Sequence, residues 1–192
     1  MTRTRALFAV VSVLALSACA SRMMVNQEPI AKPDEALIVF LRTDEAPGFT
    51  SLTLYDITDP EIKFIGMIPP LAKVAYSVKP GRYAFMVLAT STDFMEATVA
   101  AGKHYFALVS PDESTAKPRY KFTAVRQADI ATAKFIRLES AAPYVAKTPR
   151  ADEWYSRNTA PVTARREKYF MEWFRKPAQE RDAQTLRAED GQ

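Results

Sequence analysis

Residues 36–42, which read Ala36-Leu37-Ile38-Val39-Phe40-Leu41-Arg42, decide the fold that this sequence predicts. Every position between Ala36 and Arg42 is apolar, and the central three side chains are β-branched or aromatic. A strand with one solvated face would alternate apolar and polar residues, whereas a run without alternation is typical of a strand buried on both faces. We therefore expect this segment in the middle of a sheet.

Further short segments along the chain have the composition of strands. Their runs of β-branched and aromatic residues are separated by Gly, Pro and Asp at regular intervals. The expected strands are 36–42, 51–56, 63–68, 73–78, 82–89, 95–99, 104–110 and 121–126. The pattern predicts a mainly β fold, an antiparallel β-sandwich of about seven or eight short strands followed by C-terminal α-helices.

Two tight turns are expected to join consecutive strands of this sandwich. In Lys79-Pro80-Gly81-Arg82 the proline presets one backbone torsion, and Gly81 would take the positive φ of a type II turn. Ala101-Gly102 separates the next two strands in the same way. Both turns predict antiparallel hairpins, which argues against a parallel βαβ arrangement.

Three motifs carry a resemblance to a known group of proteins: the strand at 36–42, Val78-Lys79-Pro80-Gly81-Arg82-Tyr83, and Ala101-Gly102-Lys103-His104-Tyr105-Phe106. Together they resemble bacterial β-sandwich lipoproteins grouped as domains of unknown function, with kinship to PEGA and carboxypeptidase-regulatory-like modules. The resemblance covers about 90 residues. It implies a fold and a location only, because the group has no agreed activity and no catalytic residues to carry over.

The hydrophobic period changes after Arg126 from that of strands to that of helices. A helix of two or three turns is expected from Asp129 to a point before Pro143. The prolines at 143, 149 and 161 then predict a loop, with only a short helix at 152–155. A last helix is expected to begin at Thr159 or Thr163, and Pro177 is expected to end it, to kink it, or to start another helix through Asp190.

An aromatic stripe lies on this last helix. Its members share one face at helical spacing and are Tyr169, Phe170, Trp173 and Phe174. We favour the interpretation that the stripe packs on an open face of the sandwich. The alternative is an exposed docking face, which would lie on the membrane interface or in a partner's groove, with basic side chains near lipid phosphates at Arg165, Arg166, Lys168 and Arg175.

Residues 1–18 have the three parts of a secretory signal peptide. Arg3 and Arg5 form a positive start, 6–16 is an apolar run, and Ser17 and Ala18 are the small residues before a cut. The apolar run is shorter than the roughly 20 residues that span a membrane. We expect this segment to be removed.

The sequence Leu16-Ser17-Ala18-Cys19 resembles the bacterial lipobox. The resemblance implies that a lipid is attached to Cys19 and that the chain is cut before it. Ala20 stands where an Asp would signal retention in the inner membrane, which implies the outer membrane. Residues 19–34 would then be a lipidated tether, 35–127 the sandwich domain and 128–192 a helical segment.

Composition excludes several classes of function. Cys19 is the only cysteine, so lipidation leaves no thiol for a disulfide, a metal site or a nucleophile. Without Arg3 and Arg5 the chain has 24 basic and 22 acidic side chains, which are scattered and predict no nucleic-acid binding.

No catalytic, metal-binding or cofactor-binding constellation is evident. His104 is the only histidine, and neither Gly-x-Ser-x-Gly nor a Gly-rich loop occurs. Carboxylates stand mostly near strand ends, where turns favour them, at Asp56, Asp59, Glu61, Asp93, Glu96, Asp112 and Glu113. We therefore expect no metal and no cofactor.

The leading hypothesis is a non-enzymatic, lipid-anchored binding or envelope-structural module at the periplasmic face of the outer membrane. It would contact the membrane through the lipid on Cys19, and an envelope protein or the cell wall through edge strands and loops. The alternative is a hydrolase of cell-wall glycans or peptides that uses loop carboxylates.

Overall fold

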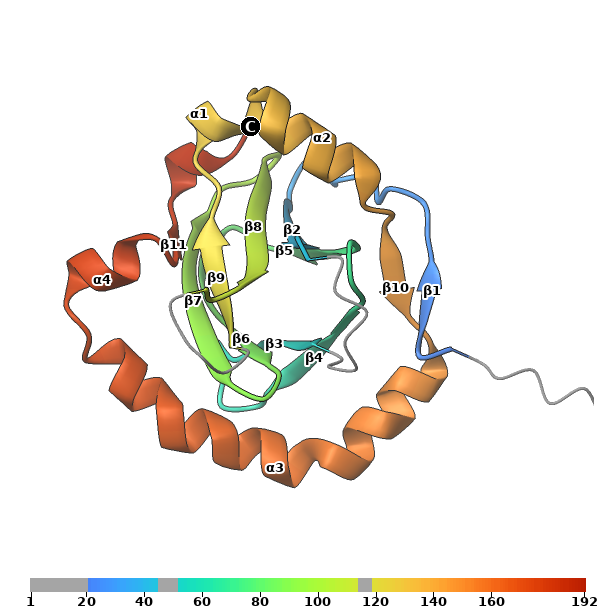
Figure 1. Cartoon of the computed structure of the whole chain (residues 1–192), viewed down its shortest axis with the longest axis vertical. Coiled ribbons are helices and arrows are strands. Elements are labelled where there is room, and N and C mark those ends of the chain that lie inside the picture. The colour runs from blue at the N-terminus through green and yellow to red at the C-terminus, as the bar shows by residue number, and fades with distance from the viewer. Residues whose placement is uncertain (1–20, 45–51, 114–118) are drawn as a thin grey trace, which may run out of the picture.

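The computed structural model describes residues 21–44, 52–113 and 119–192, which form a two-sheet sandwich followed by helices (Figure 1). The predicted mainly β fold class is confirmed. One sheet has the order β5-β2-β8-β9, from Lys73–Val78, Ala36–Arg42, His104–Pro111 and Tyr120–Ala124. The other has the order β11-β7-β6-β3-β4, from Thr185–Leu186, Thr92–Val99, Gly81–Leu88, Leu52–Asp56 and Lys63–Ile68. A separate ribbon pairs β1 (Met23–Val25) with β10 (Val145–Lys147).

Strand β2 lies inside its sheet, as its composition predicts, and all of its residues are buried. Its partners are β5, which is antiparallel, and β8, which is parallel. The aromatic ring of Phe40 points between the sheets, 5.1 Å from the ring of Phe85 and 5.9 Å from that of Phe122. Each such buried aromatic side chain contributes about 1.5–3 kcal/mol to folding.

The two predicted hairpins are wrong. β5 and β6 belong to different sheets, and so do β7 and β8, so both connections cross the sandwich. Gly81 begins β6 without a positive φ, whereas Gly102 has a φ of 69°. The residues of a turn specify that the chain changes direction. Which strands then pair depends on which of their faces are buried, and residues outside the turn decide this.

Helices α1 (Gln127–Ile130) and α2 (Ala133–Ala141) lie where the sequence predicts a helix. Thr132 caps α2, since its hydroxyl accepts a hydrogen bond from the backbone N–H of Phe135 at 3.3 Å. The ring of Phe135 packs on Phe106 at 5.1 Å, in a second, smaller core on the outer side of the β2–β8 pair.

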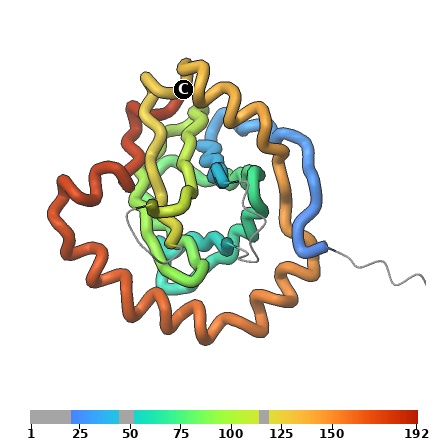
Figure 2. The backbone as a smooth tube through the Cα atoms, viewed as in Figure 1, coloured from blue at the N-terminus to red at the C-terminus, as the bar shows by residue number. Residues whose placement is uncertain are grey.

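The loop predicted between Pro143 and Pro161 is wrong, and so is the helix start at Thr159 or Thr163. Instead, α3 runs without a break over Pro149–Phe174. Pro149 lies in the first turn, where a helix tolerates proline, and Pro161 lies inside the helix. Figure 2 shows α3 curving around the outside of the sheets toward α4 (Ala178–Asp182).

The segment expected to be a tether is partly folded. Met23 is buried, and the ribbon pairs β1 with β10 in antiparallel register. The Met23 side chain lies over Gly66, where an added Cβ would stand 3.3 Å from the methionine Cε. The buried Met23 side chain and the paired backbone of β1 hold this stretch on the domain. The polar residues that follow β1 along the chain give no sign of this contact.

The last residues return to β8. Gln192 and His104 exchange backbone hydrogen bonds of 3.0 and 3.1 Å, and Lys103 Nζ donates to the carbonyl of Gly191 at 2.9 Å. The short helix η1 (Ala188–Asp190) precedes this contact. The C-terminal segment therefore belongs to the folded domain.

Candidate functional site

Helix α3 is held against the sheet at both of its ends. In its first half, the Tyr155 ring stacks on Phe64 at 5.0 Å and its hydroxyl donates to the carbonyl of Ile62 at 2.8 Å. In its second half, the Trp173 ring lies 5.9 Å from Phe94, and its indole N–H donates to Gln184 Oε1 at 2.9 Å.

Pro161 lies between these two attachments. A proline inside a helix removes one backbone hydrogen bond, and its ring crowds the preceding turn, which favours a bend at that position. Figure 1 shows α3 as an arc that follows the outside of the sheet. The contacts of Tyr155 and Trp173 with the sheet compensate for the helix stability that the proline removes.

A groove runs between α3 and the β6–β7 hairpin. Its helical wall is a stripe of residues spaced three or four apart, which are Trp154, Asn158, Pro161, Arg165, Tyr169, Glu172 and Lys176. At 1.5 Å of rise per residue, the stripe is roughly 30 Å long. The facing wall is formed by residues 88–94. We call this feature the α3 groove.

The α3 groove consists of two adjoining hollows of about 550 and 430 Å³, which share Thr90 and Arg165. The larger hollow is mainly apolar, with Met67, Leu88 and Val162 in its lining. At its far end, the guanidinium of Arg22 lies 5.8 Å from the centre of the Trp154 ring.

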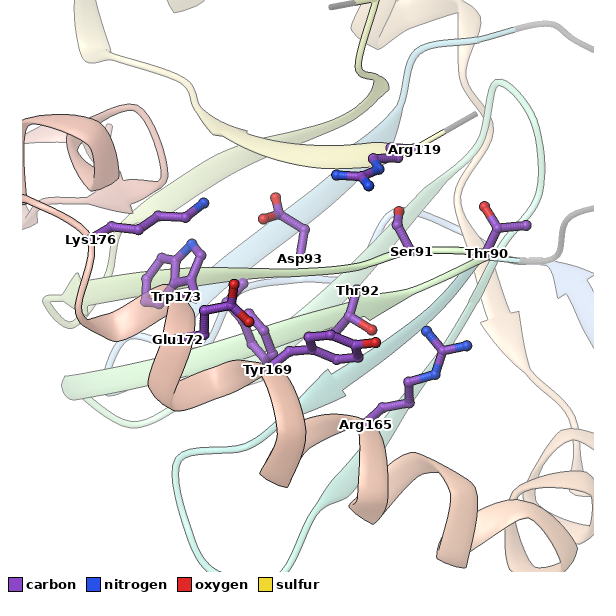
Figure 3. Close-up of a pocket in the computed structure, with 11 residues that line it drawn as sticks. Thr90, Ser91, Thr92, Asp93, Arg119, Arg165, Tyr169, Glu172, Trp173 and Lys176 are labelled. Atoms are coloured by element: carbon purple, nitrogen blue, oxygen red, sulfur yellow. The ribbon is translucent and has the colours of Figure 1, made fainter. Parts of the chain in front are cut away.

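The smaller hollow is polar and rich in cations (Figure 3). Arg165 comes from α3, Lys176 follows that helix, and Arg119 precedes β9, so three separate positions contribute a positive charge. Within the described ranges none of these three cations forms a salt bridge. The acidic groups in the lining are Asp93 and Glu172. The hollow therefore carries more positive than negative charge.

Asp93 ties the hairpin to its neighbours. Its Oδ2 accepts a hydrogen bond from the backbone N–H of Phe122 at 2.7 Å and another from Gln184 Nε2. Burial raises the pKa of Asp93, and the hydrogen bonds to the carboxylate oppose this effect only in part. These bonds link β7 to β9 and to the residue before β11, which fixes the floor of the polar hollow.

Two buried hydroxyls in the α3 groove make no hydrogen bond of regular geometry, although the Thr53 side chain lies close enough to Tyr55 to influence its pKa. They are Tyr55 Oη, in the apolar hollow, and Thr92 Oγ1, in the polar one, and they are the two such side-chain atoms in the described residues. A buried polar atom without a partner costs about 1–3 kcal/mol. Both oxygens are covered by neighbouring atoms, so neither is a contact point for a ligand in the groove.

The aromatic stripe predicted from the sequence is divided by the structure. Trp173 is buried, and Phe170 packs on Phe94 at 5.3 Å, as the favoured packing interpretation expects. Tyr169 lines the polar hollow. Phe174 is 46% exposed. Since Trp173 is inside the molecule, the four side chains do not form one docking face.

Of the other residues singled out from the sequence, Asp93 and Arg165 line the groove, and the rest of those described lie apart from it. Cys19 lies outside the described residues. His104 pairs with Gln192 at the far end of β8. Most of the predicted carboxylates have local partners: Asp56 accepts from Thr58 and Tyr76, Asp59 pairs with Lys63, Glu96 with Arg181, and Asp112 with Lys121. In the described ranges no three His, Cys, Asp or Glu side chains are grouped as a metal site would require.

Comparisons with known proteins add no relative. The chain matches no protein-family model and no curated protein. Among the described residues, no helix has both the length and the hydropathy of a membrane span. The functional proposal therefore depends on the α3 groove and on the N-terminal sequence.

Proposed function

We propose that this chain is a lipid-anchored, non-enzymatic binding module of the bacterial envelope, and that it binds its partner in the α3 groove. One observation carries the proposal: a continuous groove joins a mainly apolar hollow to a polar one, and three cations that form no salt bridge within the described part of the chain line the polar hollow.

The anchor is the lipid proposed on Cys19. It is supported by the sequence alone, because the lipobox-like motif directly follows an apolar segment and contains the only cysteine. With Ala20 next to the anchor, we place the module in the outer membrane, facing the periplasm.

The partner that best fits the α3 groove is an extended, acidic segment of an envelope protein. The groove is roughly 30 Å long by the helical rise, and an extended chain of about nine residues has that length. Arg119, Arg165 and Lys176 would face acidic side chains, and the hollow beside Met67 and Leu88 would take an apolar one.

Site-specific crosslinking in intact cells tests this proposal. A photoreactive phenylalanine replaces Asn158 in the groove or, for comparison, Gln179 on exposed α4. We expect a discrete protein adduct from position 158 only, identified by mass spectrometry. A synthetic peptide that covers the crosslinked segment should then bind the purified domain.

Charge-reversal variants test whether the crosslinked segment binds in the α3 groove. We expect Arg165→Glu to weaken peptide binding by about tenfold or more, because a charge-assisted hydrogen bond contributes about 1.5–3 kcal/mol. Arg175→Glu is the matched control, since Arg175 is exposed at the end of the same helix and does not line the groove. Equal binding by the two variants, or equal adducts from positions 158 and 179, would contradict the proposal.

The anchor has its own test. Labelled palmitate should be incorporated into the wild-type chain and not into Cys19→Ser. Incorporation into both, or into neither, would refute lipidation at Cys19 without bearing on the groove.

The alternative function, hydrolysis of cell-wall glycans or peptides, is favoured by one observation. Asp93, whose pKa is raised by burial, and Glu172 line the same hollow, and hydrolases often use two carboxylates in different environments. Against it, Asp93 Oδ2 already accepts two hydrogen bonds. Turnover of peptidoglycan by the wild type, abolished in Asp93→Asn and in Glu172→Gln, would establish the alternative.

A further inference from the structure

The chain is fixed to the domain immediately after the expected lipid site. Thr148, the residue before α3, donates from its hydroxyl to the carbonyls of Ser21 at 2.9 Å and Arg22 at 3.1 Å. Its backbone N–H also donates to the carbonyl of Arg22 at 3.0 Å. The first described residues are therefore held at the start of α3 by both donors of Thr148, with the hydroxyl proton shared between the two carbonyls.

The same N-terminal segment exposes apolar side chains. Met24 is 58% exposed, Val25 71% and Ile30 92%. Three of the six large apolar residues that are exposed in the described part of the chain thus lie within this short stretch; the others are Ile136, Met171 and Phe174. Figure 1 shows the stretch along an outer edge of the molecule, far from α4.

The covalent distance between the lipid and this edge is short. Only Ala20 separates Cys19 from Ser21. Two steps of about 3.8 Å between consecutive Cα atoms allow at most about 8 Å. A lipid held in a bilayer through Cys19 would therefore keep Ser21, two residues before β1, near the headgroup layer, where interfacial apolar side chains enter to a depth of roughly 5–10 Å.

We propose that Met24, Val25 and Ile30 form a membrane-contact edge that inserts into the bilayer carrying the Cys19 lipid. The inference depends on the proposed lipidation of Cys19. It sets the orientation of the domain: the Arg22–Trp154 end of the α3 groove lies next to the membrane, and the Lys176 end points away from it. The partner segment then enters the cation-rich end from the periplasm.

Fluorescence quenching on vesicles tests the contact edge. The chain from Cys19 to Gln192 is coupled through its only thiol to a maleimide phospholipid, in vesicles of phosphatidylethanolamine and phosphatidylglycerol that contain a brominated lipid. Ile30→Trp reports from the edge. Gln179→Trp, on exposed α4, is the matched control, and the parent chain gives the background from Trp154 and Trp173.

We expect brominated lipid to quench the added fluorescence of Ile30→Trp at least about threefold more than that of Gln179→Trp, because indole within the interface lies close to the quencher. The difference should persist at high salt, since the contact is apolar. Equal quenching of the two reporters, or a difference that salt abolishes, would overturn the proposal.

Because the lipid is attached chemically, this experiment does not depend on modification by cells. Failure of palmitate labelling would refute the anchor, whereas equal quenching would refute the orientation. Met24→Asp combined with Val25→Asp alters two exposed side chains. In the Ile30→Trp background this change should remove the excess quenching, and retention of it would also contradict the contact edge.

Discussion

Arg42 is a fully buried charge at the end of the central strand. Its Nε and one terminal nitrogen donate to the two carboxylate oxygens of Asp44 at 2.7 and 2.9 Å. It also donates to Tyr120 Oη at 2.8 Å and to the carbonyl of Ile68 at 3.2 Å. Tyr120 lies in the same sheet as Arg42 and Ile68 in the other one. This side chain therefore joins the two sheets through polar contacts at one end of the sandwich.

The carboxylate of Asp44 should make stability depend on acid pH. Burial alone would raise the pKa of Asp44, but hydrogen bonds from Arg42 and Tyr120 outweigh burial and lower it. A carboxyl whose folded pKa is depressed stabilises the protein fully above its unfolded pKa of about 3.9 and loses that contribution as pH falls through the folded pKa. We expect the free energy of unfolding, measured with urea at a series of acidic pH values, to show this loss in the wild type and not in Asp44→Asn.

At neutral pH, Asp44→Asn should lower the free energy of unfolding by about 3 kcal/mol, because it removes a carboxylate charge whose two oxygens both accept hydrogen bonds from buried Arg42. Asp34→Asn is the control, since the ion pair of Asp34 with Lys79 is exposed. A wild-type and an Asp44→Asn pH profile that coincide would show that this pair does not set the acid limit.

At the scale of elements, Pro161 lies inside the curved helix α3 and lines the larger hollow of the α3 groove, so we expect it to help shape that groove. Alanine is a far better helix former than proline, by about 3 kcal/mol in a helix interior. Because the attachments at both ends constrain the helix, we expect Pro161→Ala to raise the free energy of unfolding by only about 1 kcal/mol. It should also straighten α3 and reduce the crosslink from position 158.

Pro149→Ala provides the comparison for this change. Pro149 lies in the first turn of α3, where proline costs no helical hydrogen bond, so its replacement should alter neither stability nor crosslinking appreciably. If Pro161→Ala destabilised the protein, or left the crosslink from position 158 unchanged, the bend would not be what shapes the groove.

The sequence predicts the strands far better than it predicts α3. Buried and alternating apolar residues mark the strands from β2 to β9, because burial on one or two faces is a local signal, whereas the two-residue strand β11 was not predicted. Pro149 and Pro161 predict a loop, because proline often ends a helix. The tertiary contacts of Tyr155 and Trp173 stabilise a continuous helix instead. Once α3 is known to be continuous, the spacing of three or four residues between successive members of the stripe from Trp154 to Lys176 predicts that they share the helix face that lines the α3 groove.

At the scale of the whole molecule, the C-terminal segment closes against Tyr105. The Tyr105 ring is fully buried, and its hydroxyl accepts from the N–H of Ala100 at 2.9 Å and donates to the carbonyl of Ala188 at 3.1 Å. A Cβ at position 191 would stand 2.5 Å from Cζ of this ring. Only glycine allows the backbone to pass here.

We therefore expect Gly191→Ala to lower the free energy of unfolding by about 1–3 kcal/mol, the usual cost of overpacking, as measured by urea denaturation. Gly81→Ala is the matched control, because a Cβ there would meet the Tyr83 ring at 3.6 Å, an ordinary contact distance. Equal stability of Gly191→Ala and the wild type would mean that the C-terminal segment moves away at little cost.

Neither the closure at Gly191 nor the parallel pairing of β2 with β8 was predictable from the sequence. Both depend on contacts between residues far apart in the chain, such as Leu37 with His104, and no local periodicity encodes such a partner. The two crossing connections at Gly81 and Gly102 were misread for the same reason.

The parallel pairing of β2 also has a consequence for the time course of folding. The first partner that β2 meets is β5, but its other edge stays unpaired until β8, more than sixty residues later, has been synthesised and brought alongside. Closing so long a loop is slow, and an apolar strand with a free edge pairs readily with other chains. Residues 36–42, which define the finished sheet, are thus the segment of the nascent chain most in need of protection from aggregation.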